Sequence, residues 1–239
     1  MRDLLELMWQ RHTCRATFDP HRKIREADLA RILDAARWAP TAHNLQNFEI
    51  IVVDDERCLA SISAIRLPPA ETLIRSGDGK LTLSEAEILE RKTGLLAGMF
   101  PESWQEAESP QGDCGAQVSY VGRTIEKCPT LLVVVHDSAL NGTHSEAESL
   151  GLMSMGCVMQ NLWLMAESLG ISMQVLSAFG TSDVENKVRR ILSIPPHMKI
   201  AFAARLGYPT TVSGSYLRVR RRIKDFTHRN RYTAPEAGE

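Results

Sequence analysis

The sequence RHTCR occupies residues 11–15, directly after a short apolar segment, and RVRRR occupies residues 218–222 near the end of the chain. Both stretches concentrate permanent cations, and the first adds a hydroxyl and an imidazole. A phosphate group carries about two negative charges, and the planar fork of arginine suits its oxygens. We therefore expect the two stretches to converge on the phosphate of one bound cofactor. Composition alone would make the second stretch a solvated arm.

Composition and charge narrow the class of protein. The chain has 239 residues, 44% of them hydrophobic and 24% charged, which is enough for one large domain or two small ones. A formal net charge of −1 argues against a nucleic-acid partner bound through a basic face. No stretch approaches the ~20 apolar residues of a membrane span, so we expect no membrane partner.

The cysteines and the N-terminus indicate the compartment. None of the five cysteines forms a Cys-x-x-Cys pair, so the sequence predicts neither a disulfide framework nor a metal site. Asp3 and Glu6 interrupt the first apolar segment, which is therefore not typical of a signal peptide. We expect reduced thiols in a cytoplasmic protein.

Hydrophobic periodicity predicts the secondary structure. Helices are expected over residues 3–10, 26–38, 55–66, 149–168 and 182–192, and strands over 48–53, 130–135, 171–179 and 199–206. The first helix is interpreted as a plain packing helix. The helix over 149–168 is apolar on two sides, so we expect it in a large core or at a subunit interface, ending before Gly170.

Two other segments attract attention. The polar loop after Pro40 has small residues that can approach a flat ligand, although the loop taken alone is better explained as an ordinary helix-to-strand connection. Residues 67–115 are rich in proline and glycine and read as an insertion, with a capping box at Ser84 and Glu87. Phe100 and Trp104 either cover a pocket from this insertion or pack down on the surface.

Four segments in order resemble the nitroreductase family, which binds flavin mononucleotide (FMN). They are RHTCR at 11–15, APTAHNLQ at 39–46, the helix around QNL at 160–162 that runs into LGI at 169–171, and GYP at 207–209 followed by the basic tail. The resemblance implies an α+β fold with a central, mostly antiparallel sheet wrapped by helices. It also implies an intertwined homodimer with FMN at the interface. The whole chain would be a single domain, with the insertion at 67–115 and an arm from about 210 that embraces the partner.

The resemblance carries individual roles onto this sequence. It places Arg11, His12 and Thr13 at the phosphate and ribityl chain and Arg15 near the pyrimidine end of the flavin. It places Ser177 and Ala178 near N5, and Arg218 and Arg220 in a phosphate clamp for which Arg221 competes. The loop that approaches the ring, from the other subunit, would contribute Pro40, Thr41, Ala42, Asn44 and Gln46.

The implied activity is hydride transfer from NADH or NADPH through FMN to an electron-poor acceptor such as a nitro compound, quinone or enone. The flavin carries the chemistry, so no side chain is named as catalytic. Thr41-Ala42 stands where the family often has two serines, and Asn47-Phe48 where it usually has Pro-Trp, which bears on the ring contacts. Two alternatives stay open: a flavin-dependent oxidase of a biosynthetic intermediate, and a non-catalytic ligand- or partner-binding protein with a docking tail.

Overall fold

The computed structural model describes residues 3–65, 82–96, 125, 127–137, 147–180, 182–211 and 217–232. The chain forms two compact units. One comprises Met1–Pro68 with Pro110–Ser213, and the other comprises Pro69–Ser109 with Gly214–Glu239. The single-domain organisation stays a prediction.

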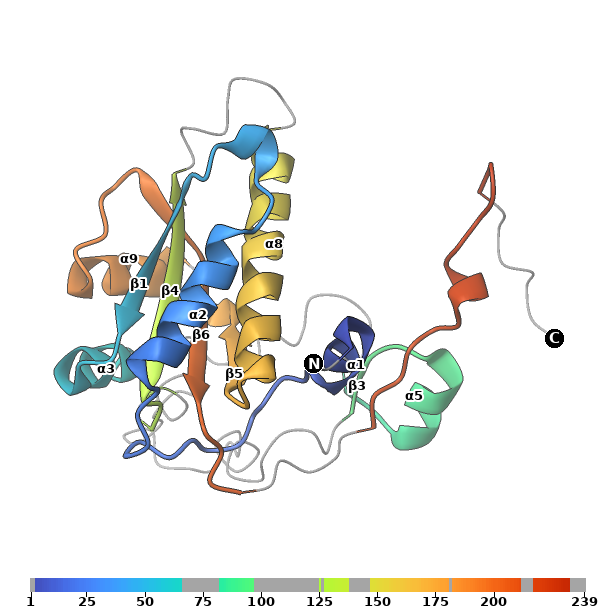
Figure 1. The fold of residues 1–239 in the computed structure, drawn as a ribbon, viewed down its shortest axis with the longest axis horizontal. Helices are drawn as coiled ribbons and strands as arrows, with labels where there is room; N and C mark the ends of the chain where they lie inside the picture. Colours follow the sequence, from blue (N-terminus) through green and yellow to red (C-terminus); the bar gives the residue numbers. More distant parts are fainter. Residues whose placement is uncertain are drawn as a thin grey trace. The chain divides into compact units, whose positions relative to one another are not determined.

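A four-stranded sheet forms the centre of the larger unit. Its order is β1 (Phe48–Val53), β4 (Thr130–Asp137), β6 (Met198–Gly207) and β5 (Ser172–Leu176), and every neighbouring pair is antiparallel (Figure 1). The continuous run of β-branched residues in β4 suits this central place, because a strand covered on both faces needs apolar side chains at successive positions. The predicted antiparallel sheet is confirmed.

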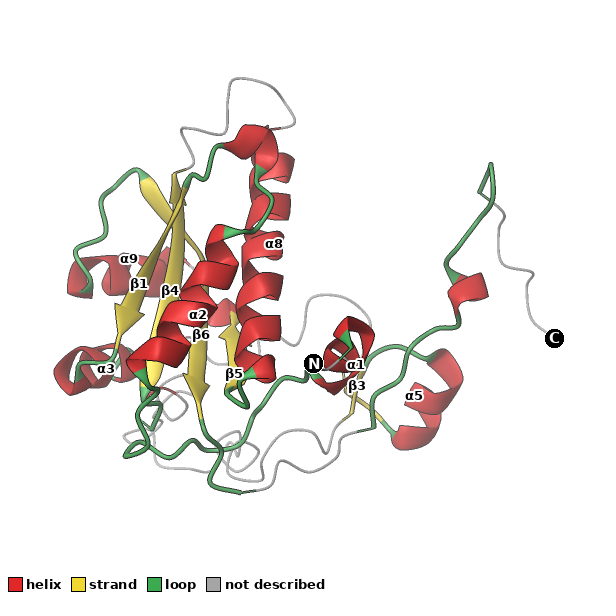
Figure 2. Cartoon of the chain, viewed as in Figure 1, coloured by secondary structure: helices red, strands yellow, loops and turns green. Residues whose placement is uncertain are grey.

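Helices cover both faces of this sheet (Figure 2). On one face α2 (Glu26–Arg37) packs beside α8 (Ala147–Ser168), and on the other lie α3 (Glu56–Ser63) and α9 (Ser182–Ile191). Successive strand residues alternate between the two cores: Val133 packs on the α3/α9 side and Val134 on the α2/α8 side. The predicted α+β architecture, with helices around the sheet, is confirmed.

The first helix lies against α8 and stays exposed. α1 (Leu4–Gln10) forms where the periodicity predicts it, but none of its residues is buried in the chain. Leu5 is 49% exposed and Trp9 is 65% exposed. The apolar pattern therefore predicted the helix correctly, and α1 contacts α8 while its own side chains stay accessible.

The strand predicted over residues 171–179 is shorter than expected. β5 ends at Leu176, and the 3-10 turn η5 (Ser177–Gly180) follows. Phe179, whose apolar side chain extended the strand pattern in the sequence, lies in this turn and is fully buried. A buried aromatic side chain at a turn gives the same local signal as a strand residue.

The smaller unit contains β2 (Thr82–Leu83), α5 (Glu85–Arg91), β3 (Leu95–Leu96) and the 3-10 turn η6 (Ile223–Asp225). β2 and β3 are parallel. The capping box is confirmed, since Ser84 Oγ accepts from the Glu87 N–H at 3.3 Å and Glu87 Oε2 accepts from the Ser84 N–H at 2.8 Å. Phe100 and Trp104 lie outside the described residues.

Candidate functional site

The pentapeptide at 11–15 begins an extended segment that runs beside the sheet. The Cys14 N–H donates to Met173 O on β5 at 3.2 Å, and the Asp19 N–H donates to Tyr208 O at 2.8 Å. Side chains of an extended chain alternate between two sides. Cys14, Ala16 and Phe18 pack into the α3/α9 core, so Arg11, Thr13 and Arg15 take the alternate positions.

Arg11 lies against α8. Its guanidinium carbon is 4.4 Å from the centroid of the Trp163 ring, a cation–π contact. Trp163 is 8% exposed, and its indole Nε1 has no hydrogen-bond partner within the described part of the chain. A guanidinium group in a cation–π contact is still a multiple N–H donor, the kind of group that binds phosphate oxygens.

His12 and Cys14 form a polarised pair. The hydrogen bond with Cys14 is the main cause that raises the pKa of His12, and burial opposes it. Burial by itself raises the pKa of the Cys14 thiol, but hydrogen bonds from His12, the Ala16 backbone and Ser172 outweigh burial, so the pKa is lowered. The raised pKa of His12 and the lowered pKa of Cys14 both favour an imidazolium–thiolate pair, whose two charges offset each other.

The sequence reasoning missed a buried cation, Arg205, that forms hydrogen bonds with this segment. Arg205 on β6 is 1% exposed, and its Nη2 donates to Cys14 O at 3.2 Å and to Ala16 O at 2.8 Å. Its Nε donates to Gln174 Oε1 at 2.7 Å. The one sequence signal is a single charged residue inside the otherwise apolar run at 200–206.

The loop after α2 is fixed to the other end of α8. It contains the 3-10 turn η1 (Ala42–Asn44), and the Ala42 N–H donates to Ser154 Oγ at 3.0 Å. His43, Asn44 and Gln46 have positive φ angles of 52°, 53° and 46°. Such a backbone turns tightly and exposes amide side chains, as a ligand-facing loop requires.

Short polar contacts hold the loop in this conformation. The Gln46 N–H donates to Thr41 Oγ1 at 3.1 Å, and Gln46 Nε2 donates to Asn44 Oδ1 at 3.1 Å. Asn47 joins the loop to the end of β4, because Asn47 Nδ2 donates to Asp137 O at 3.2 Å and the Asp137 N–H donates to Asn47 O at 3.0 Å. Asn47 stands where the resembled family usually has proline, and its hydrogen bonds hold the loop to the end of β4.

The pentapeptide and the loop contact different parts of α8 within one chain. Arg11 stacks on residue 163 and Ala42 binds residue 154, nine positions apart. At about 1.5 Å per residue, this separation is about 13 Å along the helix. Ser177 and Ala178 follow β5, the strand in which Met173 O accepts from the Cys14 N–H.

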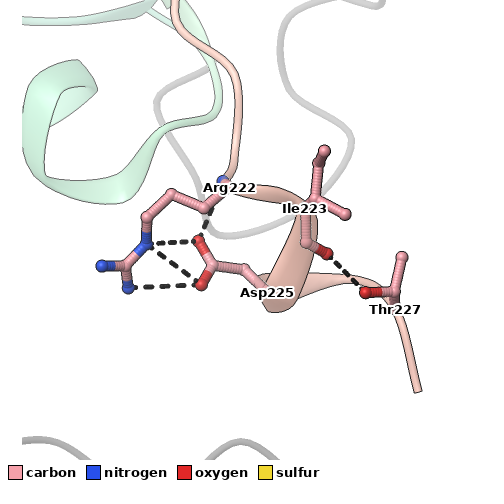
Figure 3. Close-up of polar contacts among 4 residues, drawn as sticks. All are labelled: Arg222, Ile223, Asp225 and Thr227. Carbon is pink, nitrogen blue, oxygen red and sulfur yellow. Dashed lines mark hydrogen bonds and ion pairs between the residues drawn. The ribbon is translucent and has the colours of Figure 1, made fainter. Parts of the chain in front are cut away.

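The arginines near the end of the chain belong to the smaller unit. Arg222 Nη2 pairs with Asp225 Oδ1 at 3.2 Å, and the Arg222 N–H donates to Asp225 Oδ2 at 3.0 Å (Figure 3). Arg220 Nη1 donates to Val219 O at 2.7 Å, and Arg221 stacks on Phe226. Convergence of Arg218 or Arg220 with Arg11 stays a prediction.

The described residues contain neither a candidate metal site nor a helix that could span a membrane. No group of three or more His, Cys, Asp and Glu side chains there could hold a metal ion. Within the same ranges, no helix has both the length and the apolar character to cross a bilayer.

Comparison with known proteins gives the family. A sequence model described as the nitroreductase family matches residues 8–208, which include the pentapeptide, the loop, α8 and the first two residues of GYP. The chain belongs to the nitroreductase family. Nitroreductases are oxidoreductases, and membership places this chain in that class of enzyme. No curated protein sequence matches it.

Solved structures agree with the nitroreductase fold. A nitroreductase family protein from Clostridium difficile 630 is 17% identical, with a TM-score of 0.64 over 97% of this chain and 100% of that one. A putative NADH dehydrogenase/NAD(P)H nitroreductase from Parabacteroides distasonis is 17% identical, with a TM-score of 0.61 over 97% and 100%. An FMN-dependent nitroreductase from C. difficile R20291 is 15% identical, with a TM-score of 0.60 over 96% and 100%. Likeness at these identities establishes the shared fold.

Proposed function

We propose that this nitroreductase-family protein is an FMN-dependent oxidoreductase that uses NADH or NADPH to reduce an electron-poor acceptor of the nitro, quinone or enone type. The observation that carries the proposal is the alternation at residues 11–15. Cys14 is fully buried, while Arg11, Thr13 and Arg15 take the alternate positions of an extended, sheet-anchored segment. Arg11 and Thr13 form a donor set that suits a phosphate and its sugar alcohol, and Arg15 on the same side supplies a cation for the pyrimidine end of the flavin.

The loop after α2 also fits the flavin. The loop exposes the amides of Asn44 and Gln46 on a backbone held by Thr41 and Ser154, which suits the hydrogen-bonding edge of a flat ring. When bound, FMN would supply the redox chemistry, taking a hydride from the nicotinamide and passing electrons to the acceptor.

We propose further that two copies of the chain form a homodimer with the flavin at their interface. Exposed apolar side chains on α1, the end of α2, the loop and the first half of α8 support this, because large exposed apolar patches mark interaction surfaces. They are Leu4, Leu5, Met8, Trp9, Trp38, Leu45, Leu152 and Met153. In such a dimer the loop of one copy approaches the pentapeptide of the other, as the family resemblance implies.

The first test is cofactor binding. The purified protein, incubated with FMN and then desalted, is expected to keep flavin absorbance bands. Arg11→Ala removes charge-assisted hydrogen bonds, and the dissociation constant for FMN should rise about 10- to 100-fold. Arg189→Ala is the matched control. Arg189 lies in α9, its Nη2 donates to Pro195 O at 2.7 Å, and no flavin contact proposed above involves it. A wild-type protein that retains no flavin refutes the proposal.

The second test is the direction of electron flow. Under anaerobic conditions, NADH or NADPH alone should bleach the flavin of the reconstituted protein within the assay's dead time, and a nitro compound or quinone should restore its colour. The comparison of the two nicotinamides identifies the donor. Failure of both to bleach a bound flavin refutes the reductase assignment while leaving flavin binding intact.

A further inference from the structure

We propose that Arg205 is a positioning residue. Through hydrogen bonds to backbone carbonyl groups, it fixes the conformation of the segment that begins with the phosphate-binding pentapeptide. The inference rests on the proposed function, because it concerns how residues 11–15 bind the FMN phosphate. Arg205 lies on β6, far from the pentapeptide in the sequence, and yet within hydrogen-bond distance of two carbonyl groups of the extended segment. It touches no expected cofactor atom and would act through the segment above it.

The two carbonyl groups belong to Cys14 and Ala16, on either side of Arg15, and lie 191 and 189 positions from Arg205 in the sequence. Arg205 Nη2 donates to both, at 3.2 Å and 2.8 Å. The chain bends at Ala16, and one guanidinium nitrogen that holds both carbonyl groups fixes this bend. Arg205 thereby holds the backbone on both sides of Arg15, at the end of the segment that carries Arg11 and Thr13.

Arg205 is itself held on three sides. Gln174, its partner across β5 and β6, accepts from Nε at 2.7 Å, and the guanidinium carbon lies 4.2 Å from the Phe18 ring centroid. Phe18 in turn forms an isolated bridge with Pro209. With 1% of its surface exposed, Arg205 has little freedom to move, and neither has the backbone that it holds. A planar fork with several N–H groups can make these contacts together, whereas an ammonium group cannot reproduce their geometry.

The experiment compares the affinity for FMN with that for riboflavin, which has the same ring and sugar alcohol but lacks the phosphate. The variants are Arg205→Met and Arg205→Lys, and Arg189→Met is the control, because Arg189 binds a single carbonyl at the surface of α9. Both dissociation constants are measured by flavin fluorescence quenching on the full chain, with inorganic phosphate as a competitor. Circular dichroism shows which variants are folded.

The expected result is a selective loss. In Arg205→Met and Arg205→Lys, the preference for FMN over riboflavin should fall at least about tenfold, which corresponds to about 1.4 kcal/mol. Riboflavin affinity should change less than about threefold, and inorganic phosphate should compete less well than in the wild-type protein. A purely structural role would weaken both ligands together and leave their ratio unchanged. Arg189→Met should keep the wild-type ratio.

Three outcomes overturn the inference or its basis separately. A wild-type protein that does not prefer FMN to riboflavin refutes the proposed phosphate site, and with it the proposed function. A wild-type preference that survives in both Arg205 variants refutes the positioning role alone. A preference that survives in Arg205→Lys and is lost in Arg205→Met also refutes it, because buried charge would then suffice without the two-carbonyl brace. If Arg205→Met does not fold, Arg205→Lys decides the question.

Discussion

Gly207 is the position at which the structure makes its sharpest stability prediction. It ends β6, where the chain passes between Phe18 and Pro129. A Cβ atom added there would lie 2.8 Å from Phe18 Cδ2 and 2.8 Å from Pro129 Cδ. Ordinary carbon contacts are about 3.5–4.0 Å, so Gly207→Ala requires a shift of about 0.7 Å. We expect this substitution to destabilise the fold.

The magnitude follows from what would have to move. Phe18 is fully buried beneath Arg205, and Pro129 is a rigid ring, so neither neighbour yields as the end of a flexible side chain would. Overpacking of a well-packed core costs about 1–3 kcal/mol, from which the reduced entropy of the unfolded alanine chain recovers about 0.4–1 kcal/mol. A net loss of about 1–2 kcal/mol is expected, or about 2–8 °C in Tm for a chain of this length.

Urea titration and thermal unfolding of the apoprotein measure this loss. Gly156→Ala is the matched control, since a Cβ atom there meets nothing within 4 Å and the residue lies inside α8. Replacing a glycine inside a helix should stabilise by about 0.5–1 kcal/mol. A Gly207→Ala protein as stable as the wild type would show that Phe18 or Pro129 can move aside, and would refute the argument from close packing.

Three further predictions concern other groups. Ser154→Ala leaves the Ala42 N–H without its acceptor, so the free energy of unfolding should fall by about 1–2 kcal/mol in urea titration; an unchanged value contradicts the anchoring of the loop on α8. Cys14→Ala removes the main cause that raises the pKa of His12, so the NMR titration midpoint of that ring should move down, and an unmoved midpoint refutes the pair. A raised folded-state pKa stabilises the wild type below the ordinary value of 6.5, a contribution lost as the pH rises through the folded-state pKa, and the variant should lack this pH dependence. Burial raises the pKa of Cys128 to about 12, so iodoacetamide at neutral pH should leave this thiol unlabelled in the native protein, as mass spectrometry would verify; rapid labelling contradicts its burial.

The sequence determined the local elements. The spacing of Leu29, Ile32 and Ala36 predicted α2, the β-branched run at 130–135 predicted a buried β4, and Ser84 with Glu87 predicted the start of α5. These signals involve residues close together in the chain, so their physical cause is visible in the letters. The order of the pentapeptide, the loop and GYP indicated the family, which the match over residues 8–208 confirmed.

Tertiary structure alone decided which side of each element is covered and what holds the candidate site. Periodicity made α1 a helix, but the exposure of Leu5 and Trp9 depends on which surfaces the rest of the chain leaves available. In the sequence, Arg205 is an isolated charge in an apolar strand. Only the folded structure places its guanidinium within hydrogen-bond distance of the Cys14 carbonyl. No local pattern encodes a hydrogen bond across 191 positions, because its geometry exists only after the sheet has formed.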